Sequence, residues 1–238
     1  MSAPAPLGIP AAATDLARPV VEGHDGGDYY SLMTEALHKI LLEKAVLVPA
    51  DTDRLIAALE APSVAWGAKV VARAWRDPAF KARLLVDGSA AAAELGFAIK
   101  EAKLVVVENT AEVHNVIVCT LCSCYPRSLL GQPPWWYISK NYRARTVREP
   151  RAVLKEFGLE VPLDIEVRVH DSNADMRYLV LPLAPHDAQH RSETELAGRV
   201  TRDMMIGTAI VESYAPDRPL NAGPMGRQRV VPKCLPGG

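Results

Sequence analysis

The sequence predicts an α+β protein, with a helical region at the front and a region of strands and helices behind it. Apolar residues recur at three- and four-residue spacing through residues 28–102, as on the packed face of a helix. After Lys103 the pattern changes to short β-branched runs separated by turn residues. Both chain ends are rich in Pro and Gly, so we expect a disordered N-terminal arm over 1–27 and an extended tail over 212–238.

The composition excludes several classes of partner. The 238 residues carry a net charge of −1, so no global charge attracts nucleic acid or an acidic membrane. No apolar run approaches the roughly 20 residues of a membrane span, and the N-terminus lacks a signal-peptide pattern. Three of the four cysteines are clustered, which is not a disulfide framework. We therefore expect a cytoplasmic protein that binds neither nucleic acid nor membrane.

The helical region contains several start and stop signals. Asp51 and Ser89 are candidate N-caps, and Asp77 with Pro78 predicts an N-cap followed by a first-position proline. Gly96 is expected to end the last of these helices. The first helix carries one apolar stripe, formed by Leu32, Ala36, Leu37, Ile40 and Leu41.

The second region, 103–211, contains four expected strands and a closing helix. Residues 104–107 form one run, and a second run ends at Val118, directly before Cys119. Residues 164–170 and 176–182 flank a turn, which predicts a hairpin. A last helix should begin at Ser192, with Glu195 completing a capping box, and end at Gly207. We expect His114 to be a strand histidine satisfied by backbone.

Residues 119–124 (Cys-Thr-Leu-Cys-Ser-Cys) are the most informative stretch, and we call them the claw. Three thiols within one tight turn can face a single point, together with the amide nitrogens of Ser123 and Cys124. Soft thiolates select transition metals over magnesium or calcium. A closed zinc site normally has four side-chain ligands, and the chain offers no second Cys/His pair. The pattern therefore favours a small strong-field ion that can hold deprotonated amides.

Three other interpretations of the claw are weaker. A thioredoxin-like redox pair is expected within a βαβ pattern and leaves the third cysteine unexplained. Ordinary buried thiols and a structural disulfide are the other two, and no secretory context supports a disulfide.

Two segments follow the claw. Residues 125–137 combine aromatic side chains with Pro and Gly beside the metal site, so Trp135 and Trp136 are candidate walls of a substrate pocket, or alternatively packed loop residues. Residues 140–151 are locally basic. Because the whole chain is neutral, a solvated or partner-facing helix explains them better than nucleic-acid binding does.

Residues 118–126 (Val-Cys-Thr-Leu-Cys-Ser-Cys-Tyr-Pro) resemble the metal claw of the nitrile hydratase alpha subunit. Thr120 resembles the cobalt type, because the iron type has Ser at that position. The resemblance implies a helical arm, 28–102, that packs on a partner subunit, and a metal-bearing layered α/β/β/α domain, 103–211. It covers about 29–211 and is also carried by residues 67–71, 74–80, 148–151, 171–172 and 201–207.

The resemblance also implies a cofactor and partners. Low-spin, non-corrin Co(III), or alternatively Fe(III), would be bound by the sulfurs of Cys119, Cys122 and Cys124 and by the amide nitrogens of Ser123 and Cys124. Cys122 would be a sulfinate and Cys124 a sulfenate, and Cys122, Ser123 and Cys124 would be the catalytic residues. The implied partners are a beta subunit, in an α2β2 or larger assembly, that supplies two arginines, and an activator protein that inserts cobalt.

The substrate implied by the resemblance is a nitrile, hydrated to an amide, or alternatively thiocyanate, converted to carbonyl sulfide and ammonia. The thiocyanate hydrolase gamma subunit carries the same claw. Many nitrile hydratases have Trp where this chain has Arg127, and both Arg127 and the long tail resemble thiocyanate hydrolase. Residues 186–191 also replace the usual Gly-Thr-Asp-Gly-Trp. Arg127 is a candidate pocket residue that either attracts an anionic substrate or pairs with a partner carboxylate.

Overall fold

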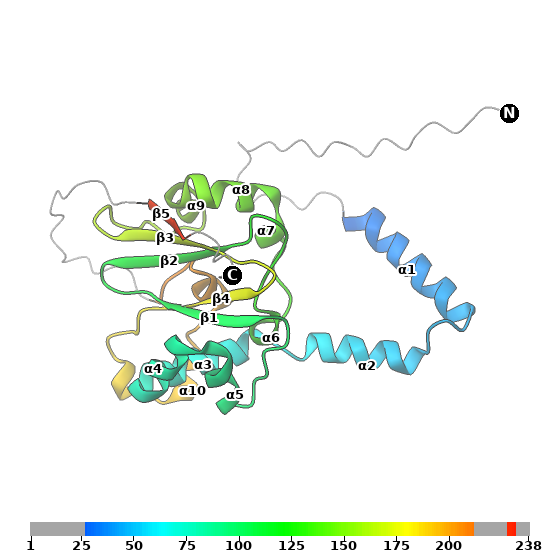
Figure 1. Ribbon diagram of the computed structural model, residues 1–238, viewed down its shortest axis with the longest axis horizontal. Helices are drawn as coiled ribbons and strands as arrows, with labels where there is room; N and C mark the ends of the chain where they lie inside the picture. The colour runs from blue at the N-terminus through cyan, green and yellow to red at the C-terminus, as the bar shows by residue number, and fades with distance from the viewer. Residues whose placement is uncertain (1–26, 212–227, 232–238) are drawn as a thin grey trace, which may run out of the picture.

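Two small β-sheets stacked between two groups of helices form the body of the protein (Figure 1). The computed structural model describes residues 27–211 and 228–231. One sheet pairs β1 (Lys103–Glu108) with β4 (Met176–Leu181). The other has the order β2-β3-β5, from β2 (Val113–Val118), β3 (Glu166–Asp171) and β5 (Gln228–Val231). The α/β/β/α layering implied by the resemblance is confirmed.

Every strand pair in the described residues is parallel, and the predicted hairpin is wrong. β3 and β4 follow one another in the chain but pair with β2 and β1, in different sheets. The turn residues between them carry the chain from one sheet to the other, a role for which they are as well suited as for a hairpin. The carboxyl ends of β2 and β3 therefore meet at one edge, where Val118 pairs with Asp171.

Helices cover both outer faces of the sheets (Figure 1). Below the β1-β4 sheet lie α3 (Val64–Arg76), α4 (Pro78–Val86), α5 (Gly88–Glu94) and α10 (Glu193–Ala197). Above the other sheet lie α8 (Lys140–Arg148) and α9 (Pro150–Glu156). The core between these layers is fully buried: Val70 of α3, Leu104 of β1 and Val167 of β3 are each 0% exposed.

The helix caps explain where the front helices begin. Asp77 accepts a hydrogen bond from the Phe80 amide at 2.9 Å, so the predicted cap of α4 is confirmed. The other two predicted caps are wrong. Asp87 caps α5, because its carboxylate reaches the Ala90 amide at 3.0 Å, whereas the Ser89 hydroxyl accepts from strand β1. Asp51 lies within the first turn of its helix, since Pro49 already has the fixed φ that suits a first helical position.

Helices α1 (Gly27–Glu43) and α2 (Pro49–Glu60) extend away from the layered body (Figure 1). The predicted stripe of α1 is present but uncovered by any other described residue: Leu32 is 65% exposed, Leu37 55% and Ile40 46%. Contiguous exposed apolar faces of this kind are typical of protein–protein interaction sites.

The predicted closing helix is two helices, α10 and α11 (Arg202–Ile206). The Ser192–Glu195 capping box that starts α10 is confirmed. Thr201 caps α11 by accepting from the Met204 amide at 3.4 Å, so its side chain starts a new helix where the pattern predicted a continuous one. Gly207 ends α11 at φ +90°, as predicted.

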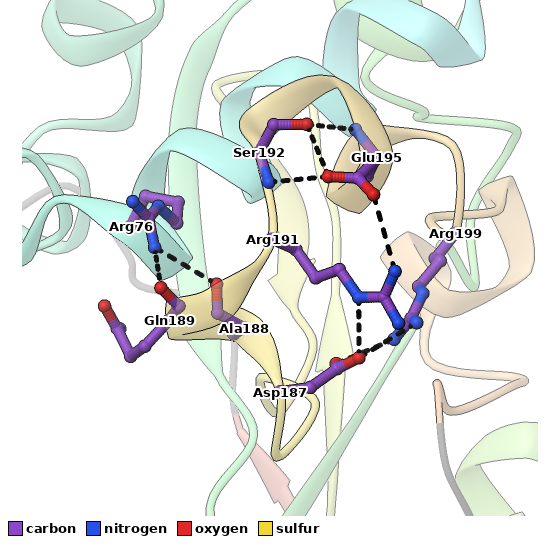
Figure 2. A network of polar contacts seen from close by, with 8 residues as sticks. All are labelled: Arg76, Asp187, Ala188, Gln189, Arg191, Ser192, Glu195 and Arg199. Atoms are coloured by element: carbon purple, nitrogen blue, oxygen red, sulfur yellow. Dashed lines mark hydrogen bonds and ion pairs between the residues drawn. The ribbon is translucent and has the colours of Figure 1, made fainter.

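A network of polar contacts joins the segment before α10 to α3 (Figure 2). This segment contains the short 3₁₀ turn at Ala188–His190. The Asp187 carboxylate accepts from Arg191 Nε at 2.9 Å and from Arg199 Nη1 at 2.8 Å, and Arg76 of α3 donates to two backbone carbonyls of the segment. Residues 187–191 thus form internal ion pairs with one another and with Arg199, and hydrogen bonds from Arg76 attach the segment to α3.

Part of the predicted C-terminal tail is a strand. β5 pairs with β3 through the register Val169↔Val230, which no pattern in the tail predicted. The remaining tail residues, including Cys234, and the predicted disordered arm up to residue 26 lie outside the described residues. Among the described helices, none combines the length and the apolar character needed to cross a membrane.

The buried histidines predict acid instability. His114 donates from Nε2 to the Gly207 carbonyl at 2.8 Å, which confirms the expected backbone partner, and burial lowers its pKa to about 4. Burial, with Arg168, also lowers the pKa of His170 to about 4. Below pH ~6.5 the unfolded chain therefore binds more protons, and each histidine should cost about 1.4 kcal/mol of stability per pH unit down to pH ~4.

Urea unfolding at pH 7.5, 6.5 and 5.5 measures this loss, because carboxylates titrate mostly below that range. His114→Gln should flatten the pH dependence, and His190→Gln, at an exposed position, should leave it unchanged. Equal slopes in all three proteins would contradict the assignment.

Candidate metal centre

Strand β2 delivers the claw to the carboxyl edge of the sheet. Cys119 follows the last strand residue directly and is 0% exposed. The Cys119 and Cys122 sulfurs lie 3.6 Å apart, the Cys122 and Cys124 sulfurs 3.2 Å, and all three lie within 4.8 Å of one another. Cys124 is buried and Cys122 is exposed, so the three sulfurs form a cup that opens toward solvent.

The environment of the thiols is uneven. A hydrogen bond from the Cys124 thiol lowers the pKa of Cys122, and the nearby amides of Ser123 and Cys124 lower it further. Burial raises the pKa of Cys124 to about 12. Of these two thiols, Cys122 thus carries negative charge more readily before a cation is present, and it is the exposed one.

Asp171, at the end of β3, clamps the claw. Its carboxylate accepts from the Thr120 amide at 2.9 Å and from the Thr120 hydroxyl at 2.7 Å. The Ser172 amide continues the ladder by donating to the Val118 carbonyl at 2.7 Å. The family resemblance includes residues 171–172 but indicates no role for them. The predicted hairpin could not show this contact, because only parallel β2–β3 pairing brings Asp171 beside Thr120.

Three further side chains hold the claw backbone. The buried Tyr137 hydroxyl donates to the Cys124 carbonyl at 2.8 Å, and the buried Tyr142 hydroxyl donates to the Ile117 carbonyl at 2.6 Å. Burial raises the pKa of both phenols well above the ordinary value, so both remain donors. Arg143 donates from Nη1 to the Cys122 carbonyl at 3.1 Å. Backbone carbonyls on both sides of the cup are thereby fixed.

The predicted pocket residues occupy different environments. Arg127 is exposed at the start of α6 (Arg127–Leu130), three residues after Cys124. Trp135 is half-buried at the start of α7 (Trp135–Ile138). Trp136 is 7% exposed, and its ring stands edge-on to Tyr142 and Phe157 at centroid distances of 4.9 and 4.7 Å. Trp136 therefore packs in the hydrophobic core, and a pocket role for Arg127, Trp135 and Trp136 stays a prediction.

The donor set suits a transition-metal ion. Three sulfurs already converge, and the amides of Ser123 and Cys124 lie close enough to the Cys122 sulfur to lower its pKa. The described residues offer no other group of three or more Cys, His, Asp or Glu side chains arranged for a metal. Soft sulfur donors without a nearby carboxylate or imidazole ligand fit cobalt or iron better than magnesium or calcium.

Comparison with known proteins agrees with this geometry. The family model described as nitrile hydratase, alpha chain, matches residues 28–209. The cobalt-containing nitrile hydratase alpha subunit of Pseudonocardia thermophila is 49% identical over 178 residues, which are 73% of this chain and 86% of that protein. The gamma subunit of Thiobacillus thioparus thiocyanate hydrolase is 43% identical over 155 residues, covering 60% of this chain and 64% of that one.

A solved structure extends the likeness to the fold. A double mutant of the Fe-type nitrile hydratase from Comamonas testosteroni Ni1 superposes with a TM-score of 0.73 at 42% identity, covering 86% of this chain and 98% of that one. The shared fold and sequence identify the chain as a subunit of a nitrile hydratase-type enzyme. The chain belongs to the nitrile hydratase alpha chain family.

Proposed function

We propose that this chain is the metal-bearing subunit of a cobalt nitrile hydratase, which hydrates nitriles to amides. The observation that carries the proposal is the convergence of the Cys119, Cys122 and Cys124 sulfurs within 4.8 Å in a Cys-Thr-Leu-Cys-Ser-Cys claw. Thr120 and the cobalt-containing relative favour cobalt, whereas the Fe-type structural relative keeps Fe(III) as the alternative.

The claw residues have separate roles in this proposal. Cys119, Cys122 and Cys124 hold low-spin Co(III) through sulfur, and Ser123 and Cys124 hold it through their amide nitrogens. When bound, the trivalent ion supplies Lewis acidity that polarises a nitrile or acidifies water at neutral pH. Cys122 as sulfinate and Cys124 as sulfenate provide oxygens that orient the substrate, and the half-buried Ser123 between them is the third catalytic residue of the proposal. Asp171, Tyr137 and Arg143 keep this backbone in place.

Thiocyanate hydrolysis is the second candidate. The exposed Arg127 beside the claw favours an anionic substrate, and the chain resembles a thiocyanate hydrolase gamma subunit over 60% of its length. Because the same claw serves both reactions, we expect the charge near the claw, and not the metal, to distinguish the two substrates.

The proposal requires a partner. The uncovered apolar face of α1, with Leu32, Leu37 and Ile40 exposed, supports packing of the helical arm on a beta subunit in an α2β2 or larger assembly. Anionic sulfur oxygens need cationic partners. Among the described residues, Arg143 donates to the Cys122 carbonyl and Arg177 lies close enough to lower the pKa of Cys124, but neither donates a hydrogen bond to a claw sulfur. We expect the isolated subunit to be inactive, and a cobalt-insertion protein to load it in the cytoplasm.

The deciding experiment offers an aliphatic nitrile and thiocyanate side by side to the complex co-expressed with its beta subunit and cobalt. Amide formation supports the first candidate, and carbonyl sulfide with ammonia supports the second. Mass spectrometry of the peptide that contains the claw should show three added oxygens. Unmodified thiols in a fully cobalt-loaded complex that turns over neither substrate would end the proposal.

The Asp171 clamp gives a sharper prediction. Asp171→Asn leaves one of the two Thr120 contacts without an acceptor, so the claw should hold cobalt about 10- to 100-fold more weakly. Cobalt retention against increasing chelator measures the change. Asp175→Asn, on the exposed link between β3 and β4, is the matched control and should retain cobalt like the parent protein. Equal retention by both variants would show that the clamp does not support the metal.

A further inference from the structure

A hollow of about 320 Å³ opens beside the claw. Thr120 forms its claw side, and the rest of its lining comes from one face of α8: Lys140, Arg143, Ala144, Val147 and Arg148. Thr120, which follows Cys119 in the chain, is the claw residue that lines the hollow, so the hollow lies next to the claw.

The lining is strongly cationic and lacks a counter-charge. Three of its six side chains are Lys or Arg, and no carboxylate lines it. Among the described residues, none of the three forms an ion pair, whereas the neighbouring Arg145 pairs with Glu149 at 2.5 Å and with Glu156 at 2.6 Å. On a chain with a net charge of −1, three uncompensated cations around one concavity are a local arrangement and not a consequence of overall composition.

Arg143 links the hollow to the claw. Its Nη1 donates to the Cys122 carbonyl at 3.1 Å, while its Nε is buried without a hydrogen-bond partner. Because Nε is buried, an anion in the hollow would be held by the Nη groups of the guanidinium. The planar guanidinium is well suited to hold an anion with one N–H while another N–H contacts the claw.

We propose that this hollow collects small anions for the claw, so that the enzyme prefers anionic substrates such as thiocyanate or a nitrile that carries a carboxylate. Lys140 and Arg148 raise the local concentration of the anion, and Arg143 holds it next to the Cys122 carbonyl. This inference rests on the proposed function, because it assigns a substrate charge to the same metal site.

The test compares two substrates of nearly the same shape and different charge, cyanoacetate and cyanoacetamide, with thiocyanate as a third. The test variants of the cobalt-loaded complex are Lys140→Gln and Arg148→Gln. The matched control is a separate variant, Lys155→Gln, which removes an exposed cation of α9. We expect kcat/KM for the anions, or the inhibition constant for an anion that is not turned over, to worsen about 3- to 10-fold at low salt. The effect should shrink toward nothing at 0.5 M salt, about where screening suppresses surface electrostatics, while cyanoacetamide and kcat stay unchanged.

A second measurement avoids the metal. Calorimetric titration of thiocyanate into the cobalt-free complex should detect binding that both variants weaken and the control keeps. The proposal is overturned if the variants affect cyanoacetate and cyanoacetamide equally, or if the anions neither react nor inhibit. It is also overturned if the only effect of the variants is to dissociate the complex, which would assign the hollow to a partner carboxylate. A complex that turns over no substrate at all refutes the proposed function instead, and thiocyanate binding by the cobalt-free complex is then still a separate result.

Discussion

Cys119→Ala should abolish cobalt binding and reduce activity of the complex by at least about 1,000-fold. Cys119 is the fully buried sulfur at the end of β2, and its sulfur lies 3.6 Å from that of Cys122. Removing it leaves two sulfurs on a turn that no other described cysteine, histidine or carboxylate can complete. The variant therefore loses both the ion and the Lewis acidity that the ion supplies, so we expect the largest loss of activity of any single substitution proposed here.

Elemental analysis of the purified complex, together with its rates of nitrile hydration and thiocyanate hydrolysis, measures this outcome. Cys234→Ala, which removes the one cysteine outside the claw, is the control and should keep both metal and activity. Retention of cobalt by Cys119→Ala at the parent stoichiometry would mean that the ion is bound elsewhere.

Gly207→Ala should be the most destabilising Gly→Ala substitution among the described glycines. Gly207 has φ +90°, and a Cβ there would lie 2.0 Å from the Asn115 carbonyl oxygen and 2.9 Å from the Val116 Cα. Both atoms belong to the backbone of β2, so the strand that carries the claw would have to move. The left-handed backbone alone costs about 1–2 kcal/mol, and with the overlap we expect a total of about 4 kcal/mol or more.

Gly96→Ala separates these two costs. Gly96 has φ +84°, but nothing lies within 4 Å of its would-be Cβ, so only the backbone term applies. Urea unfolding should place Gly96→Ala about 1–2 kcal/mol below the parent and Gly207→Ala much lower, or in the insoluble fraction. Equal losses for the two variants would contradict the close contact of α11 with β2.

The order of elements and the composition of the claw could be predicted from sequence because both depend on local signals. A cap such as Asp77 binds within three residues, and three thiols within six residues must come close together whatever surrounds them. The prediction of one continuous helix over 192–207 was wrong because of another local signal: the side chain of Thr201 caps and starts a second helix.

Strand pairing could not be predicted, because it depends on contacts between residues far apart in the chain. The turn at 171–175 fits a hairpin and a crossing between sheets equally well, and only the parallel partners of β3 and β4 distinguish them. The missed contact of Asp171 follows from the hairpin error, and the missed contact of Tyr142 is long-range in the same way. Asp171 reaches Thr120 from 51 positions away, and Tyr142 reaches Ile117 from 25, so neither contact has a local signature.

The packing of the aromatic loop was also beyond sequence reasoning. Trp135 and Trp136 are adjacent and chemically identical, yet one is half-buried and the other packs against Tyr142 and Phe157. A four-residue helix, α7, turns the two rings in different directions, and its position is set by the Tyr137 contact with the claw.

X-ray absorption at the cobalt edge of the co-expressed complex tests the metal assignment most directly. Three sulfur neighbours with nitrogen or oxygen at shorter distance, and the edge position of a trivalent ion, are the expected result. Cobalt surrounded only by nitrogen and oxygen, or a complex that purifies with tetrahedral zinc in place of cobalt, would contradict it.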